Sequence, residues 1–224
     1  MLQSRNDILK KLATDISKYS PIIIHGATGV GKSFFVNKLC KELCANGTIR
    51  NFKIRASWDV LDGMIQALCE QNLLSWENEL LSSDIFVIDD LHCLQGKKAT
   101  AKELNKIFRS VRAPIIITTS IPICIENFPN EDMVSFLNQG TLIDLNSLMP
   151  TDLPEYMEAA LKECEFQLTK EALDWLASLK IPSFSVVDGM IHMLQLHNEY
   201  DGEIIDIESC ERILAPLIQE RTML

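Results

Sequence analysis

The sequence predicts an α/β fold, with a P-loop-type parallel sheet sandwiched by helices and followed by a small all-helical lid domain. Two observations predict it. Short, strongly apolar runs alternate with helical patterns along residues 1–149, and such alternation is typical of parallel sheets covered by helices on both faces. After Pro150 only helical patterns remain. We therefore expect an α/β domain over residues 1–149 and a helical lid domain over residues 150–224.

The predicted strands are short runs rich in Ile, Val and Phe. Continuous apolar runs of this kind are typical of parallel strands, because these are buried on both faces. Three runs are strongly apolar, at residues 21–25, 85–90 and 114–119. Two weaker candidates lie at residues 52–56 and 142–145.

The predicted helices repeat apolar residues every three or four positions. The N-terminal segment shows this pattern at residues 8, 9, 12 and 16, and Gly47 ends the second helix. In the first domain we expect helices over residues 2–18, 34–45, 60–70 and 98–112. In the second we expect four helices, over about residues 152–164, 169–179, 184–197 and 206–220.

The bulk composition narrows the class of protein. The 224 residues are 47% hydrophobic and 23% charged, close to the averages of soluble globular proteins. No apolar run reaches the roughly 18–20 residues that cross a bilayer, and residues 1–18 lack a signal-peptide core. We expect a cytoplasmic protein with no membrane association.

Cysteine and histidine spacing argues against a zinc site. The seven cysteines form no Cys-x-x-Cys pair, and the four histidines are not spaced with them as zinc ligands would be. We expect reduced, mostly buried thiols.

The net charge of −10 is unevenly spread. Residues 1–112 carry 16 basic and 12 acidic side chains, whereas residues 113–224 carry 5 basic and 19 acidic ones. The second half therefore repels a phosphate backbone, so any nucleic acid would be bound by the first half. The acidic half suits a basic or helical protein partner better.

Residues 26–33, Gly-Ala-Thr-Gly-Val-Gly-Lys-Ser, match the pattern Gly-x-x-x-x-Gly-Lys-Ser/Thr in full. The glycines let backbone N–H groups converge on phosphate oxygens, Lys32 supplies a point charge, and the Ser33 hydroxyl can bind Mg²⁺. The helix that follows directs its positive end at the phosphates. The predicted nucleotide-binding residues are Gly26, Ala27, Thr28, Gly29, Val30, Gly31, Lys32, Ser33 and Phe34. The alternative is a structural glycine turn.

Two carboxylates follow the buried run at residues 86–88. Ligands of open parallel sheets lie at the carboxyl ends of the strands. We expect Asp89 to reach Mg²⁺ directly or through water, and Asp90 to orient or deprotonate an attacking water. The alternative is an ordinary strand end with an Asp-Asp turn.

A third strand ends in Thr118-Thr119-Ser120. A hydroxyl at this end would lie near the γ-phosphate, and we assign that role to Thr119 as a second catalytic candidate. The alternative is a simple strand end with no chemical role.

Together, the three strand ends and the C-terminal helices resemble the AAA+ ATPases, and in particular the ATPase part of the bacterial initiator DnaA and its regulators such as Hda. The resemblance spans roughly residues 20–200. It rests on residues 26–33, on the Asp-Asp, Gly-Lys, Thr and Glu spacing within residues 88–103, and on the strand and helix over residues 52–72. It implies ATP or ADP with Mg²⁺ as cofactors, and a DNA-replication partner such as an initiator or a helicase.

The chain departs from the AAA+ pattern in its arginines. It contains none from Ala113 to Glu211, although AAA+ proteins usually carry an arginine finger and a second sensing arginine there. By rough alignment Phe136 falls near the finger and Ser185 near the second sensor, with Lys180 as the one substitute. We expect weak assembly-stimulated hydrolysis, no arginine-finger assembly, and no helix-turn-helix DNA-binding domain of the initiator kind.

Basic residues gather within residues 97–112. Lys98, Lys102, Lys106 and Arg109 share one helix face, which we interpret as solvated, with a weak contact surface for DNA or protein as the alternative. The favoured hypothesis is an ATP-binding switch with slow hydrolysis that regulates or loads a replication partner. The others are a degenerate interaction module with a structural nucleotide, and a nucleoside kinase, which the missing lid arginines argue against.

Overall fold

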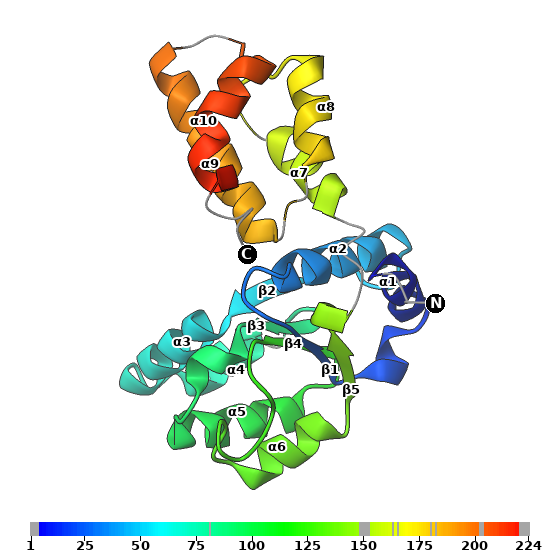
Figure 1. Cartoon of the computed structure of the whole chain (residues 1–224). Coiled ribbons are helices and arrows are strands. Elements are labelled where there is room, and N and C mark those ends of the chain that lie inside the picture. Colours follow the sequence, from blue (N-terminus) through cyan, green and yellow to red (C-terminus); the bar gives the residue numbers. More distant parts are fainter. Residues whose placement is uncertain are drawn as a thin grey trace. The chain divides into compact units, whose positions relative to one another are not determined.

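The computed structural model describes residues 5–80, 82–147, 153–162, 164, 166–179, 181, 183–201 and 204–219 (Figure 1). Its contacts divide the chain into two compact units, residues 1–28 with 32–149, and residues 150–224 with the loop residues 29–31. The expected boundary near Pro150 and the candidate sensor Lys180 both lie outside the described residues.

The first unit is built on a five-stranded sheet in the order β2-β3-β4-β1-β5, with every neighbouring pair parallel. The three central strands are almost wholly buried, as their unbroken apolar sequences require. This sheet confirms the predicted fold class. The strands are β1 (Ile22–His25), β2 (Lys53–Ala56), β3 (Phe86–Asp89), β4 (Ile115–Thr119) and β5 (Thr141–Asp144).

Helices cover both faces of the sheet (Figure 1). Helices α1 (Arg5–Thr14) and α2 (Lys32–Ala45) lie on one side, and α5 (Lys98–Ser110) and α6 (Glu131–Asn138) on the other. Helices α3 (Ser57–Cys69) and α4 (Leu73–Leu80) follow β2. A buried apolar cluster joins α3, α5 and α6 to β3 and β4. Single-turn helices η1 (Ile16–Tyr19), η2 (Leu91–Leu94) and η3 (Leu145–Ser147) complete the unit.

The second unit packs four helices around their own core. These are α7 (Leu153–Lys162), α8 (Lys170–Ser178), α9 (Phe184–Asp201) and α10 (Ile207–Gln219). Val187, Leu194, Cys210 and Leu214 are fully buried in that core. One isolated parallel bridge joins Leu168 to Ile205, the only extended pairing in the described part of this unit.

Two helices were not predicted from the sequence. Helix α4 follows Gln71, whose backbone has a positive φ of 55°, so the chain turns sharply and starts a new helix after only three intervening residues. Helix α6 is capped by Asn130, whose side chain accepts a hydrogen bond from the amide of Met133 at 2.7 Å. The predicted N-terminal helix is also shorter than expected, because the chain breaks at Asp15 into the single turn η1.

Candidate functional site

The carboxyl ends of the five strands lie at one edge of the sheet. The register pairs His25 of β1 with Thr119 of β4 on one side and with Asp144 of β5 on the other. Asp89 of β3 pairs with Ala56 of β2 in the same way. Since parallel strands all end on this edge, the polar residues that follow them are brought together here.

The glycine-rich loop leaves β1 at this edge and enters α2. The amide of Gly26 donates to the carbonyl of Thr119 at 3.2 Å, which holds the start of the loop against β4. Gly29 and Gly31 have positive φ values of 78° and 90°, a conformation that residues with a Cβ rarely adopt. Thr28 is exposed, and Phe34 is half-buried in the first turn of α2.

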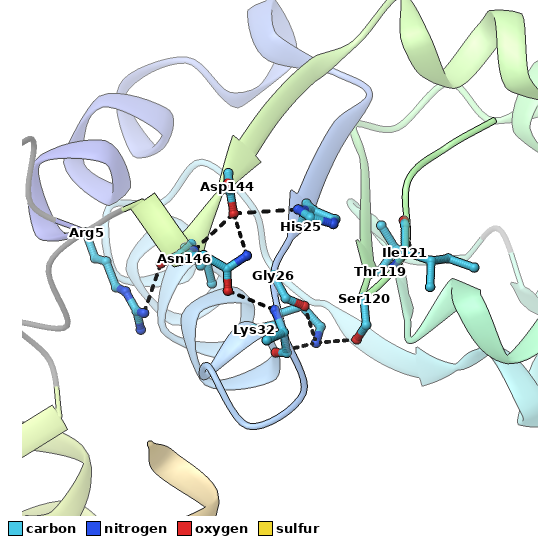
Figure 2. A network of polar contacts seen from close by, with 11 residues as sticks. Arg5, His25, Gly26, Lys32, Thr119, Ser120, Ile121, Asp144 and Asn146 are labelled. Atoms are coloured by element: carbon cyan, nitrogen blue, oxygen red, sulfur yellow. Dashed lines mark hydrogen bonds and ion pairs between the residues drawn. The ribbon is translucent and has the colours of Figure 1, made fainter. Parts of the chain in front are cut away.

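Lys32 is the first residue of α2 and is only 6% exposed. Its amine donates to the carbonyls of Gly26 at 3.1 Å and Ala27 at 3.2 Å, and to the hydroxyl of Ser120 at 2.8 Å (Figure 2). Burial lowers the pKa of Lys32 below that of an exposed lysine, while the carboxylates of Asp90 and Asp89 oppose the shift. The amine therefore lies within the loop, with carboxylates nearby.

Ser33 and Asp89 meet across the loop. The hydroxyl of Ser33 donates to Oδ2 of Asp89 at 2.6 Å. The other carboxylate oxygen of Asp89 accepts a hydrogen bond from the hydroxyl of Thr118 on β4. The Ser33 hydroxyl, which follows β1, and the Asp89 carboxylate, at the end of β3, thus form a pair of adjacent oxygen atoms that could both bind a metal ion.

Asp90 has a left-handed backbone, with φ of 56°. Its amide donates to the Thr118 hydroxyl at 2.8 Å, and its carbonyl accepts from the Ser57 hydroxyl at 2.7 Å. One carboxylate oxygen lies 3.7 Å from Nδ1 of His92, a buried nitrogen without a hydrogen-bond partner in the described part of the chain. The backbone of Asp90 is thus held from both sides, while its carboxylate faces His92.

The two residues at the end of β4 face different ways. Ser120 reaches Lys32, whereas the hydroxyl of Thr119 donates to the carbonyl of Ile121 at 2.9 Å and accepts from the amide of the same residue at 3.2 Å (Figure 2). Thr119 is fully buried and lines a mostly apolar cavity of about 450 Å³ with His25 and Ile121. The structure therefore brings Ser120, and not Thr119, to the amine of the loop.

A polar network that sequence reasoning missed connects the loop to β5 (Figure 2). The side-chain oxygen of Asn146 accepts from the amide of Ala27 at 2.9 Å. Asp144 accepts from both the amide and the side chain of Asn146, at 3.0 and 2.9 Å, and lies 3.5 Å from Nδ1 of His25. The buried Arg5 donates to the carbonyl of Leu145 at 3.2 Å. The signal in the sequence is the pair of polar residues, Asp144 and Asn146, after a weak strand.

The remaining candidates lie outside the loop and the strand ends. Lys98, Lys102, Lys106 and Arg109 are all exposed on α5, and Lys106 pairs with Glu103 at 2.7 Å. Phe136 stacks on Phe108, and the guanidinium of Arg109 lies 5.9 Å from the centre of the Phe136 ring. Ser185, near the start of α9, lies against loop residue Gly29, because a Cβ added at Gly29 would collide with the Ser185 side chain. The amide of the preceding Phe184 donates to the carbonyl of Gly29 at 3.0 Å.

All seven cysteines are free thiols. Across the described ranges, no three His, Cys, Asp or Glu side chains gather closely enough to hold a metal ion by themselves. Among the helices that the structure describes, none combines the length and the apolar character of a bilayer crossing.

The curated proteins with similar sequences include bacterial replication initiators. The chromosomal replication initiator protein DnaA of Rickettsia bellii is 22% identical over 209 residues, and that of Rickettsia massiliae is 22% identical over the same length. Each match covers 91% of this chain but 45% of the relative. The chain therefore spans about half the length of the curated relatives it matches.

Solved structures share the fold at low sequence identity. Domain III of the replication initiation protein DnaA from Thermotoga maritima superposes with a TM-score of 0.72 at 21% identity, covering 95% of this chain and 90% of that one. AMPPCP-bound DnaA from Aquifex aeolicus gives 0.66 at 22% identity, covering 97% and 63%. The model of the bacterial DnaA ATPase domain family matches residues 5–144, more than half of the chain. On the strength of that match, the chain belongs to the DnaA ATPase domain family of AAA+ proteins.

Proposed function

We propose that this protein binds ATP or ADP with Mg²⁺ at residues 26–33, and that it acts as a slow ATPase or nucleotide switch that regulates or loads a DNA-replication partner. The observation that carries the proposal is the pairing of Ser33 with Asp89 at 2.6 Å beside the buried amine of Lys32. A fixed cation next to two oxygen donors at the start of a helix suits a phosphate chain with its metal ion.

The residues present fit Mg²⁺. Magnesium prefers oxygen ligands and keeps several waters, and it is usually held by one or two carboxylates together with phosphate oxygens. The Ser33 hydroxyl and the Asp89 carboxylate are such donors, and Thr118 orients that carboxylate. When bound, the ion would neutralise charge on the phosphates. The chain itself would supply Lys32 and the loop amides as further phosphate contacts.

We assign Asp90 to orienting an attacking water. Its carboxylate lies 3.7 Å from Nδ1 of His92, beyond the length of a hydrogen bond, so its oxygens can still accept from a water. Thr119 was the predicted phosphate sensor, but the contact between Ser120 and Lys32 supports Ser120 in that role. Ser120→Ala should lower ATP turnover without lowering stability, and Thr119→Val should lower stability more than turnover. The reverse result, measured by phosphate release and thermal melting, would restore Thr119 as the sensor.

Slow turnover follows from the missing arginines. An arginine finger contributes about 10³–10⁵ to the rate of nucleoside triphosphatases that use one, and no arginine lies between Ala113 and Glu211. The replication partner is supported by the names of the matching relatives, which are chromosomal replication initiators. A solved neighbour is described as replication initiator DnaA bound to AMPPCP and single-stranded DNA. We place this protein with such partners in the cytoplasm.

Fluorescent ATP and ADP analogues test the nucleotide site directly. We expect dissociation constants tighter than about 1 mM in the presence of Mg²⁺, and at least tenfold weaker binding by Lys32→Ala, because the lost contact is to a charged phosphate. Lys41→Ala is the matched control, since Lys41 is exposed on the same helix. Wild-type binding weaker than about 1 mM would refute the proposal.

The rate of ATP hydrolysis distinguishes a nucleotide switch from a degenerate module that holds its nucleotide only as a structural part. We expect single-turnover hydrolysis of radiolabelled ATP to be slow and to gain little with protein concentration. A strong gain that Arg109→Ala removed would show that this arginine acts on a neighbouring copy. No hydrolysis, with partner binding unaffected by Lys32→Ala, would favour the degenerate module. Rapid phosphate transfer to a nucleoside would indicate a kinase instead.

A further inference from the structure

Helices α3 and α4 expose large apolar side chains that the core does not use. Trp58 is 48% exposed, Ile65 49%, Leu68 54% and Leu74 73%. The opposite side of α3 is buried, with Val60, Leu61 and Met64 packed in the apolar cluster and Ala67 also buried. Helix α3 is therefore apolar on its outer side as well as on its inner side. We call Trp58, Ile65, Leu68 and Leu74 the α3–α4 strip.

The spacing places the α3 residues of the strip largely on one side of the helix. Trp58 and Ile65 are seven residues apart, which places them two turns apart on one face of the helix. Leu68 lies three residues after Ile65, and the exposed Cys69 lies four after it. The face runs from Trp58 to Cys69, about 16 Å at 1.5 Å per residue. Three helical turns of a partner would cover that length.

The strip lies within an acidic segment. Residues 57–80 contain Asp59, Asp62, Glu70, Glu77 and Glu79, and they contain no lysine or arginine. This is opposite in sign to the net charge of residues 1–112 as a whole. Asp59 and Asp62 are exposed on α3 itself. Asp62 lies about one turn from both Trp58 and Ile65 on the same face of α3, so the strip combines apolar side chains with negative charge.

Two lysines from neighbouring segments reach the edges of this surface. The amine of Lys97 lies 3.7 Å from the ring centre of Trp58, and the amine of Lys53 lies 3.6 Å from a carboxylate oxygen of Glu79. The Lys97 contact is a cation–π pair, so this chain's own lysine already lies over the Trp58 ring. Asp59, Asp62 and Glu70 add negative charge on α3, so the surface as a whole attracts positive charge.

We propose that the α3–α4 strip docks a basic amphipathic helix of a partner protein. A helix of this kind binds through apolar anchors at i, i+3 or i+4 and i+7, which span about 10 Å of its length, and the stretch of α3 from Trp58 to Leu68 is long enough to contact all of them. Lysines or arginines beside those anchors would meet Asp59 and Asp62. Nucleic acid fits poorly, because its phosphates would face five carboxylates.

This inference does not require the loop to bind nucleotide, so it and the proposed function can fail separately. The probe is a fluorescein-labelled 14-residue peptide of Leu and Lys at helical spacing, without aromatic residues. The comparison probes are the same peptide with Glu in place of Lys, and a 14-nucleotide thymidine strand. Affinity is measured by fluorescence anisotropy on the full chain, at low and high salt.

We expect only the basic peptide to bind. Ile65→Ser and Leu68→Ser should each weaken it about fivefold, because each removes an anchor that the free protein leaves about half exposed. Leu196→Ser is the matched control: Leu196 is 57% exposed on α9, within the acidic second half of the chain. The double variant Asp59→Asn, Asp62→Asn should reduce the salt dependence of binding.

Tryptophan emission adds a readout at the strip itself. The peptide should shift the emission of the wild type to shorter wavelength, and Trp58→Phe should remove the shift while keeping the affinity within about twofold, since the phenyl ring still offers an apolar anchor. Nucleotide affinity and melting temperature show that each variant is folded. The inference is overturned by unchanged affinity in both serine variants, by stronger binding of the acidic peptide or the DNA, or by no binding of the basic peptide.

Discussion

Truncating Asn146 to alanine tests whether β5 holds the phosphate loop in shape. The substitution removes the acceptor for the Ala27 amide at 2.9 Å and the side-chain hydrogen bond to Asp144. One hydrogen bond contributes about 0.5–1.5 kcal/mol net, and the exposure of Asn146 favours the lower half of that range. If the first bond keeps the loop ready for nucleotide, affinity should fall about two- to fivefold. The melting temperature should fall by about 2–4 °C.

The assay is a titration with a fluorescent ATP analogue in the presence of Mg²⁺, combined with thermal melting. Asn138→Ala is the matched control. The Asn138 side-chain amide also donates to a backbone carbonyl, that of Ile123 at 3.4 Å, but it makes no hydrogen bond to residues 26–33 in the described part of the chain. We expect this control to bind nucleotide as the wild type does. Unchanged or tighter binding by Asn146→Ala would refute the reasoning, since it would show that the Ala27 amide serves the nucleotide better when released.

Two further predictions concern packing and thiol chemistry. Gly140→Ala would place a Cβ 2.0 Å from the carbonyl oxygen of Pro21 and should lower the free energy of unfolding by about 3 kcal/mol. At Gly47, where φ is 76° but nothing lies within contact distance, the change to alanine should lower the free energy of unfolding by only about 1 kcal/mol. Equal losses for the Gly140 and Gly47 variants in denaturant melts would contradict this account. Burial, together with the neighbouring Cys44, raises the pKa of Cys40 to about 12. At pH 8 iodoacetamide should therefore label the exposed Cys69 long before Cys40, and mass spectrometry of both peptides would show any exception.

Much of the fold could be predicted because the buried strands are visible in the sequence as short, continuous apolar runs. The runs ending at His25, Asp89 and Thr119 are apolar throughout, as strands buried on both faces must be. The strand order was not predictable in this way, because it depends on how helices pack between strands. Helix α4 escaped prediction because it is eight residues long and starts after the positive-φ residue Gln71. Helix α6 is equally short, and its cap, Asn130, also resembles an ordinary loop residue.

The candidate site also has residues that could be predicted from the sequence and residues that could not. Contiguous residues carry the loop motif, so residues 26–33 could be recognised from spacing alone, and Asp89 follows from its place at the end of an apolar run. Ser120 and Asn146 could not be recognised, because their contacts arise from strand register. Neighbouring residues in a strand point to opposite faces, so the sequence alone did not decide whether the Thr119 or the Ser120 hydroxyl reaches Lys32. The network of Asp144 and Asn146 exists only because β5 pairs with β1.

The left-handed backbone of Asp90 has a consequence for how this position can evolve. A residue with a Cβ in that conformation is roughly 1–2 kcal/mol less stable than glycine would be. Selection for stability alone would therefore favour glycine at position 90, whereas selection for chemistry would favour a carboxylate. Asparagine satisfies the backbone almost as well as aspartate and removes only the charge. If Asp90 orients the attacking water as proposed, the choice among glycine, asparagine and aspartate at this position in related chains would indicate whether catalysis was lost or maintained in each lineage.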